Sequence, residues 1–128
     1  DHISIIVSGL ETNDERKTID ILMTRLRALT QALDIGVIIV SHLKRPEGNK
    51  DHTDGLKTSL GQLRGSASIG QLSDVVIGVE RCVSGEADSQ TVCRILKNRF
   101  AGITGVACQL EYDNQKGRLF EHDNSLNF

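Results

Sequence analysis

The chain has 128 residues, of which 38% are hydrophobic and 25% charged, and its formal net charge at pH 7 is −2. This balance predicts one soluble globular domain with a modest core and excludes an intrinsically disordered chain. The small net charge also excludes a surface that is basic throughout, so any contact with nucleic acid must come from a local patch. No run approaches the roughly 18 apolar residues needed to cross a bilayer, so we expect no membrane contact and a cytoplasmic location.

The cysteines and aromatic residues exclude two further classes. Cys82, Cys93 and Cys108 are an odd count without Cys-x-x-Cys spacing, which argues against a disulfide framework and a zinc site. We expect reduced, partly buried thiols. Aromatic residues make up only 3% of the chain and tryptophan is absent, which argues against a surface that stacks several bases.

The first third of the chain combines short apolar runs with one amphipathic segment. Ile3 to Val7 is an apolar run that predicts a strand leaving a sheet. Asn13 or Asp14 can cap a helix, and apolar residues at helical spacing from Ile19 to Leu33 predict a helix that packs on a core. We expect Gly36 to end this helix, because glycine favours the backbone conformation found just after a helix.

The next segment changes from apolar to polar. Val37 to Val40 is a continuous β-branched run, too apolar to have a face in water. A strand buried on both faces and directly following a helix predicts a parallel strand–helix–strand unit. Lys44 to Ser59 is then polar and has no periodicity, and loops of this length in compact domains are usually functional or disordered.

The second half of the chain predicts one short helix and several strands. Gly61 to Ser73 reads as a loop leading into a helix with Ile69 and Leu72 turned inward. We expect strands at Asp74–Val79, Thr91–Leu96, Val106–Tyr112 and Arg118–Phe120, with turns at Ser84–Asp88 and Asn114–Gly117. The sheet should therefore be parallel in the middle of the chain and antiparallel at its end.

Polar side chains at strand ends are the first candidates for a site. Lys97 and Arg99 lie two residues apart, so on an extended chain they project from one face, where they could meet a phosphate of a neighbouring subunit. His42 closes the apolar run at Val37 to Val40. The alternatives are a solvated strand end for the two cations and a capping role for the histidine.

Several short motifs occur in a fixed order. They are Asp1-His2-Ile3-Ser4, Ser41-His42-Leu43-Lys44, Leu63-Arg64-Gly65-Ser66 with Gln71-Leu72-Ser73-Asp74 behind it, Glu80-Arg81, and Arg94-Ile95-Leu96-Lys97-Asn98-Arg99-Phe100. Through these motifs, residues 1 to 121 resemble the C-terminal part of the helicase domain in phage-type primase-helicases. That family is related to the bacterial replicative hexameric helicase and the mitochondrial Twinkle helicase.

This resemblance implies the fold. It implies an α/β, RecA-like P-loop NTPase core of which residues 1–128 are the C-terminal half, with parallel strands and a C-terminal antiparallel hairpin. Residues 122–128 are expected to be a flexible tail. The phosphate-binding motif Gly-x-x-x-x-Gly-Lys-[Ser/Thr] occurs nowhere in the chain, so the P-loop half is expected to be missing. We therefore expect the isolated chain to hydrolyse no ATP and to unwind no DNA.

The resemblance also implies the residues that contact nucleotide. Asp1 matches the carboxylate that holds Mg²⁺ on the nucleotide, and His42 matches the sensor of the γ-phosphate. Arg99, with Lys97 beside it, matches the arginine finger that reaches the active site of the adjacent subunit. The further nucleotide-binding positions are Arg81, Tyr112 and Gln71, although Tyr112 also suits a plain strand aromatic.

The DNA contacts follow from a second group of matches. The loop Arg64-Gly65-Ser66-Ala67 matches the element that lines the central channel, where arginine and backbone N–H groups bind phosphates irrespective of sequence. Lys44 and Arg45 add positive charge, and a solvated loop is their alternative role. Gly70 departs from the family pattern, in which a cation or an acid often precedes the Gln-x-x-Asp segment.

The complete protein would then be an ATP-dependent replicative DNA helicase. It would use ATP or another NTP with Mg²⁺ and translocate on single-stranded DNA as a hexameric or heptameric ring, with a DNA polymerase and a primase domain as further partners. For a phage protein the compartment would be the cytoplasm of the bacterial host. A RecA-like recombinase or repair ATPase, and a non-catalytic DNA-binding or regulatory scaffold, remain alternatives because one fold serves many functions.

Overall fold

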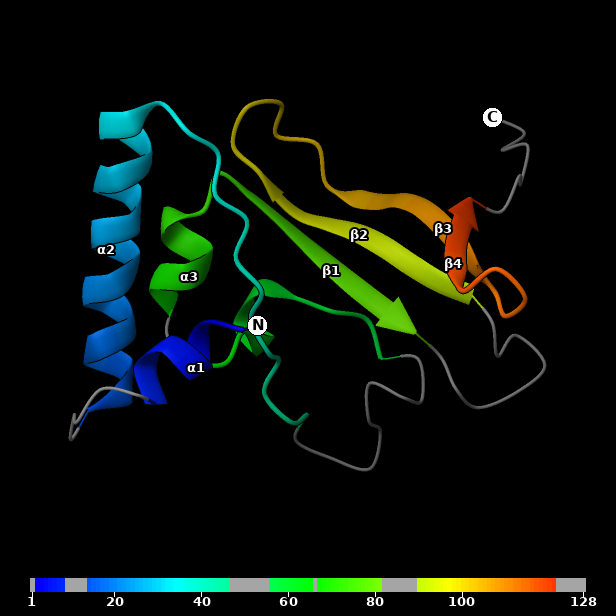
Figure 1. The fold of residues 1–128 in the computed structure, drawn as a ribbon, viewed down its shortest axis with the longest axis horizontal. Coiled ribbons are helices and arrows are strands. Elements are labelled where there is room, and N and C mark those ends of the chain that lie inside the picture. Colours follow the sequence, from blue (N-terminus) through cyan, green and yellow to red (C-terminus); the bar gives the residue numbers. More distant parts are fainter. Residues whose placement is uncertain (1, 9–13, 47–55, 66, 82–89, 122–128) are drawn as a thin grey trace. The chain divides into compact units, whose positions relative to one another are not determined.

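The computed structural model describes residues 2–8, 14–46, 56–65, 67–81 and 90–121. The chain divides into two compact units, coloured along the sequence in Figure 1. The helical unit comprises Asp1–Lys44 and Leu60–Asp74, and the sheet unit comprises Arg45–Ser59 and Val75–Phe128. Within the described part of the chain, no helix is both long and apolar enough to span a membrane.

The helical unit is dominated by one long helix. Its elements are α1 (Ile3–Ser8), α2 (Glu15–Leu33), the 3₁₀ helix η2 (Leu60–Gln62) and α3 (Ala67–Leu72). Asp14 is the N-cap of α2, as predicted, and its side chain accepts a hydrogen bond from the Lys17 amide at 3.1 Å. The predicted stop at Gly36 is wrong: α2 is capped two residues earlier by Asp34, which adopts a left-handed conformation at φ 50°. Aspartate tolerates that conformation better than most residues.

A small apolar core holds the helices of this unit together. The buried side chains are Ile3, Val7, Ile19, Met23 and Ile69, and the partly buried Leu22, Ile39, Leu63 and Leu72 pack against them. The predicted inward positions on α3 are therefore confirmed. An ion pair between Arg27 and Asp74 also joins α2 to the residue after α3. The C-terminal end of the predicted apolar face of α2 is not buried, because Leu29 and Leu33 are 45% and 58% exposed.

The prediction of a strand at Ile3 to Val7 is wrong, because this segment is α1. Ile3 and Val7 are buried whereas Ile5 and Ile6 are 48% and 56% exposed. Residues four apart share one face of a helix, so burial of this pair stabilises the helical form despite the β-branched composition.

The prediction of a strand buried on both faces at Val37 to Val40 is also wrong. No strand runs through this segment, and Ile38 is 97% exposed while Ile39 packs on the core. Val40 alone forms an isolated parallel bridge, with His2, in which the Ile3 amide donates to the Val40 carbonyl at 2.9 Å. Among the described residues, no strand lies alongside residues 35–39 to cover the second face.

The sheet unit contains four strands in the order β1-β2-β3-β4 (Figure 1). The strands are β1 (Val75–Arg81), β2 (Gln90–Asn98), β3 (Gly105–Asp113) and β4 (Arg118–Glu121). All four predicted strands of the second half are confirmed, as is the tight connection at Asn114–Gly117, where Gly117 has φ 63°. Every pairing is antiparallel, so the parallel pairing expected in the middle of the chain is not found for β1 in the described sheet. The predicted turn at Ser84–Asp88 and tail at 122–128 lie outside the described residues.

Candidate functional site

Two candidate segments of the helical unit are paired through their backbones. The Arg64 amide donates to the His42 carbonyl at 2.9 Å, and the Lys44 amide donates to the Gln62 carbonyl at 2.7 Å. Leu43 and Leu63 form an antiparallel bridge between these bonds. We call this two-stranded contact of residues 42–44 with residues 62–64 the sensor–loop pairing. It joins the candidate phosphate sensor directly to the candidate DNA loop.

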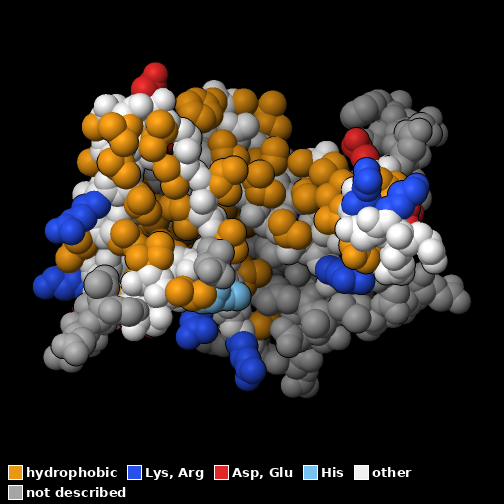
Figure 2. Space-filling view, in the orientation of Figure 1, with side chains coloured by type: hydrophobic (Ala, Val, Ile, Leu, Met, Phe, Trp, Pro, Cys, Tyr) orange, Lys and Arg blue, Asp and Glu red, His pale blue; other side chains and the backbone are white. Residues whose placement is uncertain are grey.

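The side chains around this pairing are available for ligands. His42, Lys44, Arg45 and Arg64 are all exposed. The space-filling view shows a histidine and several Lys and Arg side chains exposed close together (Figure 2). Lys44 and Arg64, on the two paired segments of the helical unit, therefore bring positive charge to this pairing although the whole chain carries a net charge of −2, as a phosphate-binding surface requires.

A second histidine, His2, lies beside the candidate sensor. Its ring is 4.0 Å from the His42 ring, centroid to centroid, at an interplanar angle of 64°. Burial, followed by the charges of His42 and Arg64, lowers the pKa of His2. Its Nδ1 is buried and finds no hydrogen-bond partner within the described part of the chain. His2 therefore favours its neutral form next to His42.

The glycine of the candidate DNA loop is required by packing. Gly65 has φ 102°, and a Cβ built there would lie 2.5 Å from Cδ1 of Ile19 on α2. Any other residue would meet both a backbone penalty and a clash with the core. The loop is therefore held tightly against α2, with Arg64 exposed on one side and Ala67, the first residue of α3, exposed on the other.

The remaining candidates lie on different elements. Gln71 is exposed on α3 in the helical unit, whereas Arg81 ends β1 and Tyr112, 42% exposed, lies in β3 of the sheet unit. Lys97 is in β2, but β2 ends at Asn98, so Arg99 stands in the following turn. The strand alternation used to place Lys97 and Arg99 on one face therefore does not extend to Arg99.

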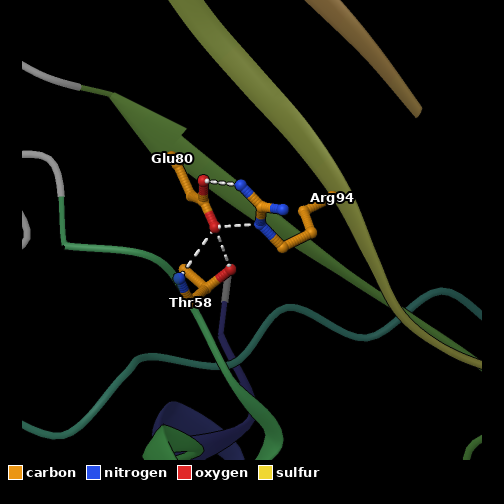
Figure 3. A network of polar contacts seen from close by, with 3 residues as sticks. All are labelled: Thr58, Glu80 and Arg94. Carbon is orange, nitrogen blue, oxygen red and sulfur yellow. Dashed lines mark hydrogen bonds and ion pairs between the residues drawn. The ribbon is translucent and has the colours of Figure 1, made fainter. Parts of the chain in front are cut away.

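A partly buried polar network joins β1, β2 and Thr58 of the sheet unit (Figure 3). The Glu80 carboxylate on β1 accepts hydrogen bonds from the amide and the hydroxyl of Thr58, both at 2.7 Å. Arg94 on β2 donates to the same carboxylate through Nε at 2.7 Å and through a terminal nitrogen at 3.0 Å. The hydrogen bond from Arg94 lowers the pKa of Glu80 to about 2, with the bonds from Thr58 adding to the effect against the opposing effect of burial. Glu80 is therefore ionised at neutral pH and fixes Thr58 to the sheet.

Comparison with known families places this geometry in context. The family described as DnaB-like helicase C terminal domain matches residues 1–121. The chain belongs to this family. Over 119 residues, or 93% of its length, the chain is 44% identical to the DNA helicase/primase of Enterobacteria phage T3. It spans 21% of the length of that relative.

Membership in the DnaB-like family confirms the resemblance predicted from the short motifs. The match ends at residue 121, where the sequence also predicted the resemblance to end. It includes the sensor–loop pairing and the strands that carry Arg81, Lys97 and Tyr112. Two predicted site residues of this helicase domain, Asp1 and Ser66, lie outside the described residues.

Sequence reasoning missed several residues that the structure brings together. His2 follows Asp1 in one of the short motifs, but nothing else in the sequence indicates that it contacts His42. Glu80 and Arg94 both belong to the short motifs, but the motifs do not show that the two side chains meet. Their contact depends on the register of β1 on β2, in which Gly78 lies opposite Arg94. Thr58 belonged to a polar loop without periodicity, so no sequence pattern pointed to it.

Proposed function

We propose that the protein containing this chain is a replicative DNA helicase that translocates on single-stranded DNA as a ring and is driven by hydrolysis of ATP or another NTP. The chain supplies the carboxyl half of its RecA-like motor domain. The observation that carries this proposal is the sensor–loop pairing, in which the Arg64 amide binds the His42 carbonyl at 2.9 Å. A motor must connect its nucleotide site to its DNA site, and this pairing offers a direct connection.

The mechanism we propose begins at His42. Its exposed ring senses whether the γ-phosphate is present, and the difference in contacts between the ATP and ADP states shifts the segment from His42 to Lys44. Because the Leu43–Leu63 bridge and its two flanking hydrogen bonds tie this segment to residues 62–64, the shift moves Arg64. Gly65 keeps this loop close to Ile19, because a Cβ there would lie 2.5 Å from the Ile19 side chain.

DNA would be held through its phosphates. Arg64, Lys44 and Arg45 are exposed cations, and we assign Gly65, Ser66 and Ala67 to the same contact. Such contacts follow the backbone of a single strand without reading its sequence. A translocating motor needs this tolerance, because it must accept every base in turn.

The nucleotide contacts are the second part of the proposal. We place Asp1 on Mg²⁺, where a carboxylate suits a hard cation, and we assign Arg81, Tyr112 and Gln71 to the nucleotide. Lys97 and Arg99 act on the nucleotide of the adjacent subunit in a hexameric or heptameric ring, where arginine stabilises charge on the transferring phosphoryl group. The P-loop would come from a part of the protein that this chain does not contain.

The position of the metal-binding residue and further partners complete the proposal. The parallel bridge between His2 and Val40 supports a place for Asp1 near His42, because it joins the segments on which these two residues stand. The phage T3 relative is named a DNA helicase/primase, so we place a primase domain in the same protein and a DNA polymerase among its partners. The site of action is then the cytoplasm of a bacterial host.

Replacement of Arg64 in the complete protein tests the DNA contact. We expect Arg64→Ala to weaken binding of fluorescent single-stranded DNA and to lower the slope of log affinity against log salt by about 1, because one phosphate contact is lost. Fluorescence anisotropy at several salt concentrations measures both effects. Arg16→Ala is the matched control, since Arg16 is an exposed cation on α2 to which no DNA contact is assigned. An Arg64→Ala protein with the affinity and salt slope of the control would contradict the proposal.

A further inference from the structure

Two free cysteines face each other across neighbouring strands of the sheet unit. Cys93 on β2 and Cys108 on β3 are directly paired in the antiparallel register. Both are free thiols of intermediate burial. Opposed residues of an antiparallel pair have Cα atoms about 4.5 or 5.5 Å apart, and both values fall within the range of about 4.4 to 6.8 Å that a disulfide spans.

The two thiols of this pair also influence each other. Burial, followed by the interaction with the Cys108 thiol, raises the pKa of Cys93. The register also shifts next to the pair, where Arg94 is opposite Val106 and Ala107 is the extra residue on β3. Such a bulge bends one strand locally, which gives the two Cβ atoms room to adjust to a covalent link.

The thiols lie on an accessible face of the sheet. Cys93 is paired with Val79 of β1 on its other side, and Val79 is 64% exposed. Arg94 belongs to the opposite face, where it binds Glu80, because successive residues of a strand point to opposite sides. A small oxidant can therefore reach the thiols without disturbing the network of Thr58, Glu80 and Arg94.

We propose that Cys93 and Cys108 form a reversible oxidation site, which a peroxide converts into a cross-strand disulfide. One thiolate attacks hydrogen peroxide, the O–O bond breaks, and the products are a sulfenic acid and hydroxide, which takes up a proton to become water. The second thiol attacks the sulfenic sulfur, the S–S bond forms, and a second water leaves. Overall, two thiols lose two electrons and two protons, and one peroxide is reduced to two waters.

The disulfide would close the turn between β2 and β3 into a covalent loop. Lys97 and Arg99 both lie between Cys93 and Cys108 in the sequence. Oxidation therefore restrains the segment that carries these two cations and fixes the pairing of β2 with β3. An effect on ATP hydrolysis between subunits would follow only through the proposed function of Arg99, whereas formation of the disulfide does not depend on it.

Peptide mapping tests the site without an activity assay. Trypsin cuts after Arg81, Arg94, Arg99 and Lys116, so Cys93 lies in peptide 82–94 and Cys108 in peptide 100–116. Cys82 shares the first peptide, and the experiment therefore uses the complete protein with Cys82→Ser. After hydrogen peroxide, quenching and alkylation, mass spectrometry should find the two peptides linked, with the loss of two hydrogens, and dithiothreitol should separate them.

The rate of disulfide formation distinguishes a pair of thiols held together by the fold from cysteines that are oxidised at random. We expect the link to form about tenfold or more faster in the native protein than in protein unfolded by urea, because the fold holds the two sulfurs together. Adding Cys108→Ser should abolish the linked peptide and leave Cys93 on its own. Recovery of the two peptides separately after peroxide, or a link that forms no faster in the native protein than in urea, would overturn the proposal.

Discussion

The helical unit and the sheet unit are stabilised in different ways. In the helical unit the buried side chains are apolar, and Ile3 and Ile19 are 2% and 0% exposed. In the described part of the sheet unit the buried side chains are the polar Thr58 and Thr91, while apolar residues such as Val79 are 64% exposed. Hydrophobic burial therefore dominates the first unit, and strand pairing with the Glu80 network dominates the second. Substitutions should affect the two units separately.

The chain carries a convenient probe for this comparison. Tyr112 is its only tyrosine, and there is no tryptophan, so tyrosine fluorescence reports on β3. Helical circular dichroism reports mainly on the helical unit, which holds α1, α2 and α3. Urea unfolding followed by both signals can then show which unit a substitution weakens.

The largest expected effect is on the helical core. Ile19→Ala should lower the free energy of unfolding by about 2 to 5 kcal/mol, because it removes a fully buried side chain and leaves a cavity. The circular dichroism transition should move to lower urea further than the Tyr112 transition. Ile21→Ala is the control, since Ile21 is on the same helix but 47% exposed. Equal losses for the two variants would refute the assigned core.

A smaller effect is expected on the sheet unit from Gly78→Ala. The added Cβ would lie 2.0 Å from Oγ1 of Thr58, and that hydroxyl cannot move away without breaking its bond to Glu80. We expect a loss of about 2 kcal/mol from this overpacking, seen first in Tyr112 fluorescence. Gly36→Ala should be close to neutral, because no atom lies within 4 Å of the added Cβ. A fluorescence transition identical in the two variants would show that β1 has more room than the structure gives it.

The smallest effect, and the one that depends on pH, concerns the charge of Glu80. At pH 7, Glu80→Gln should cost about 1 to 2 kcal/mol by weakening the bonds from Arg94 and Thr58. Because the pKa of Glu80 is lowered to about 2 from a model-compound value of 4.5, ionised Glu80 stabilises the fold above pH 4.5. This contribution is lost as the pH falls towards 2. The difference between wild type and variant, measured by urea unfolding at several pH values, should therefore shrink over that window; a constant difference would mean that the charge is unimportant.

Elements with a clear period were predictable from the sequence, and those that depend on distant partners were not. The spacing from Ile19 to Met23 identified α2, and alternation identified β2 and β3. The five residues from Ile3 to Val7 suit a helix or a strand equally well, because a short apolar run carries no period. Only the burial of Ile3 and Val7 on one face decides for the helix.

For the candidate site, the sequence predicted the positions of residues but not the contacts between them. Motifs located His42, Arg64 and Arg99 along the chain, because each stands in a short and specific run. Their mutual contacts depend on pairing across a long polar segment, which no local pattern specifies. The hydrogen bond from Arg64 to His42 and the link from Thr58 to Glu80 are both of this kind.

The sensor–loop pairing also indicates where a peptide could be inserted into this protein. Its hydrogen bonds, from Lys44 to Gln62 and from Arg64 to His42, clamp both ends of the polar segment that begins at Arg45. Lengthening a loop costs only about 0.6 kcal/mol for each doubling of its length. A peptide tag or a fluorescent label placed between Glu47 and Gly55 should therefore leave the distance from His42 to Arg64 unchanged. The segment is therefore a suitable position for a label that reports on the sensor–loop pairing.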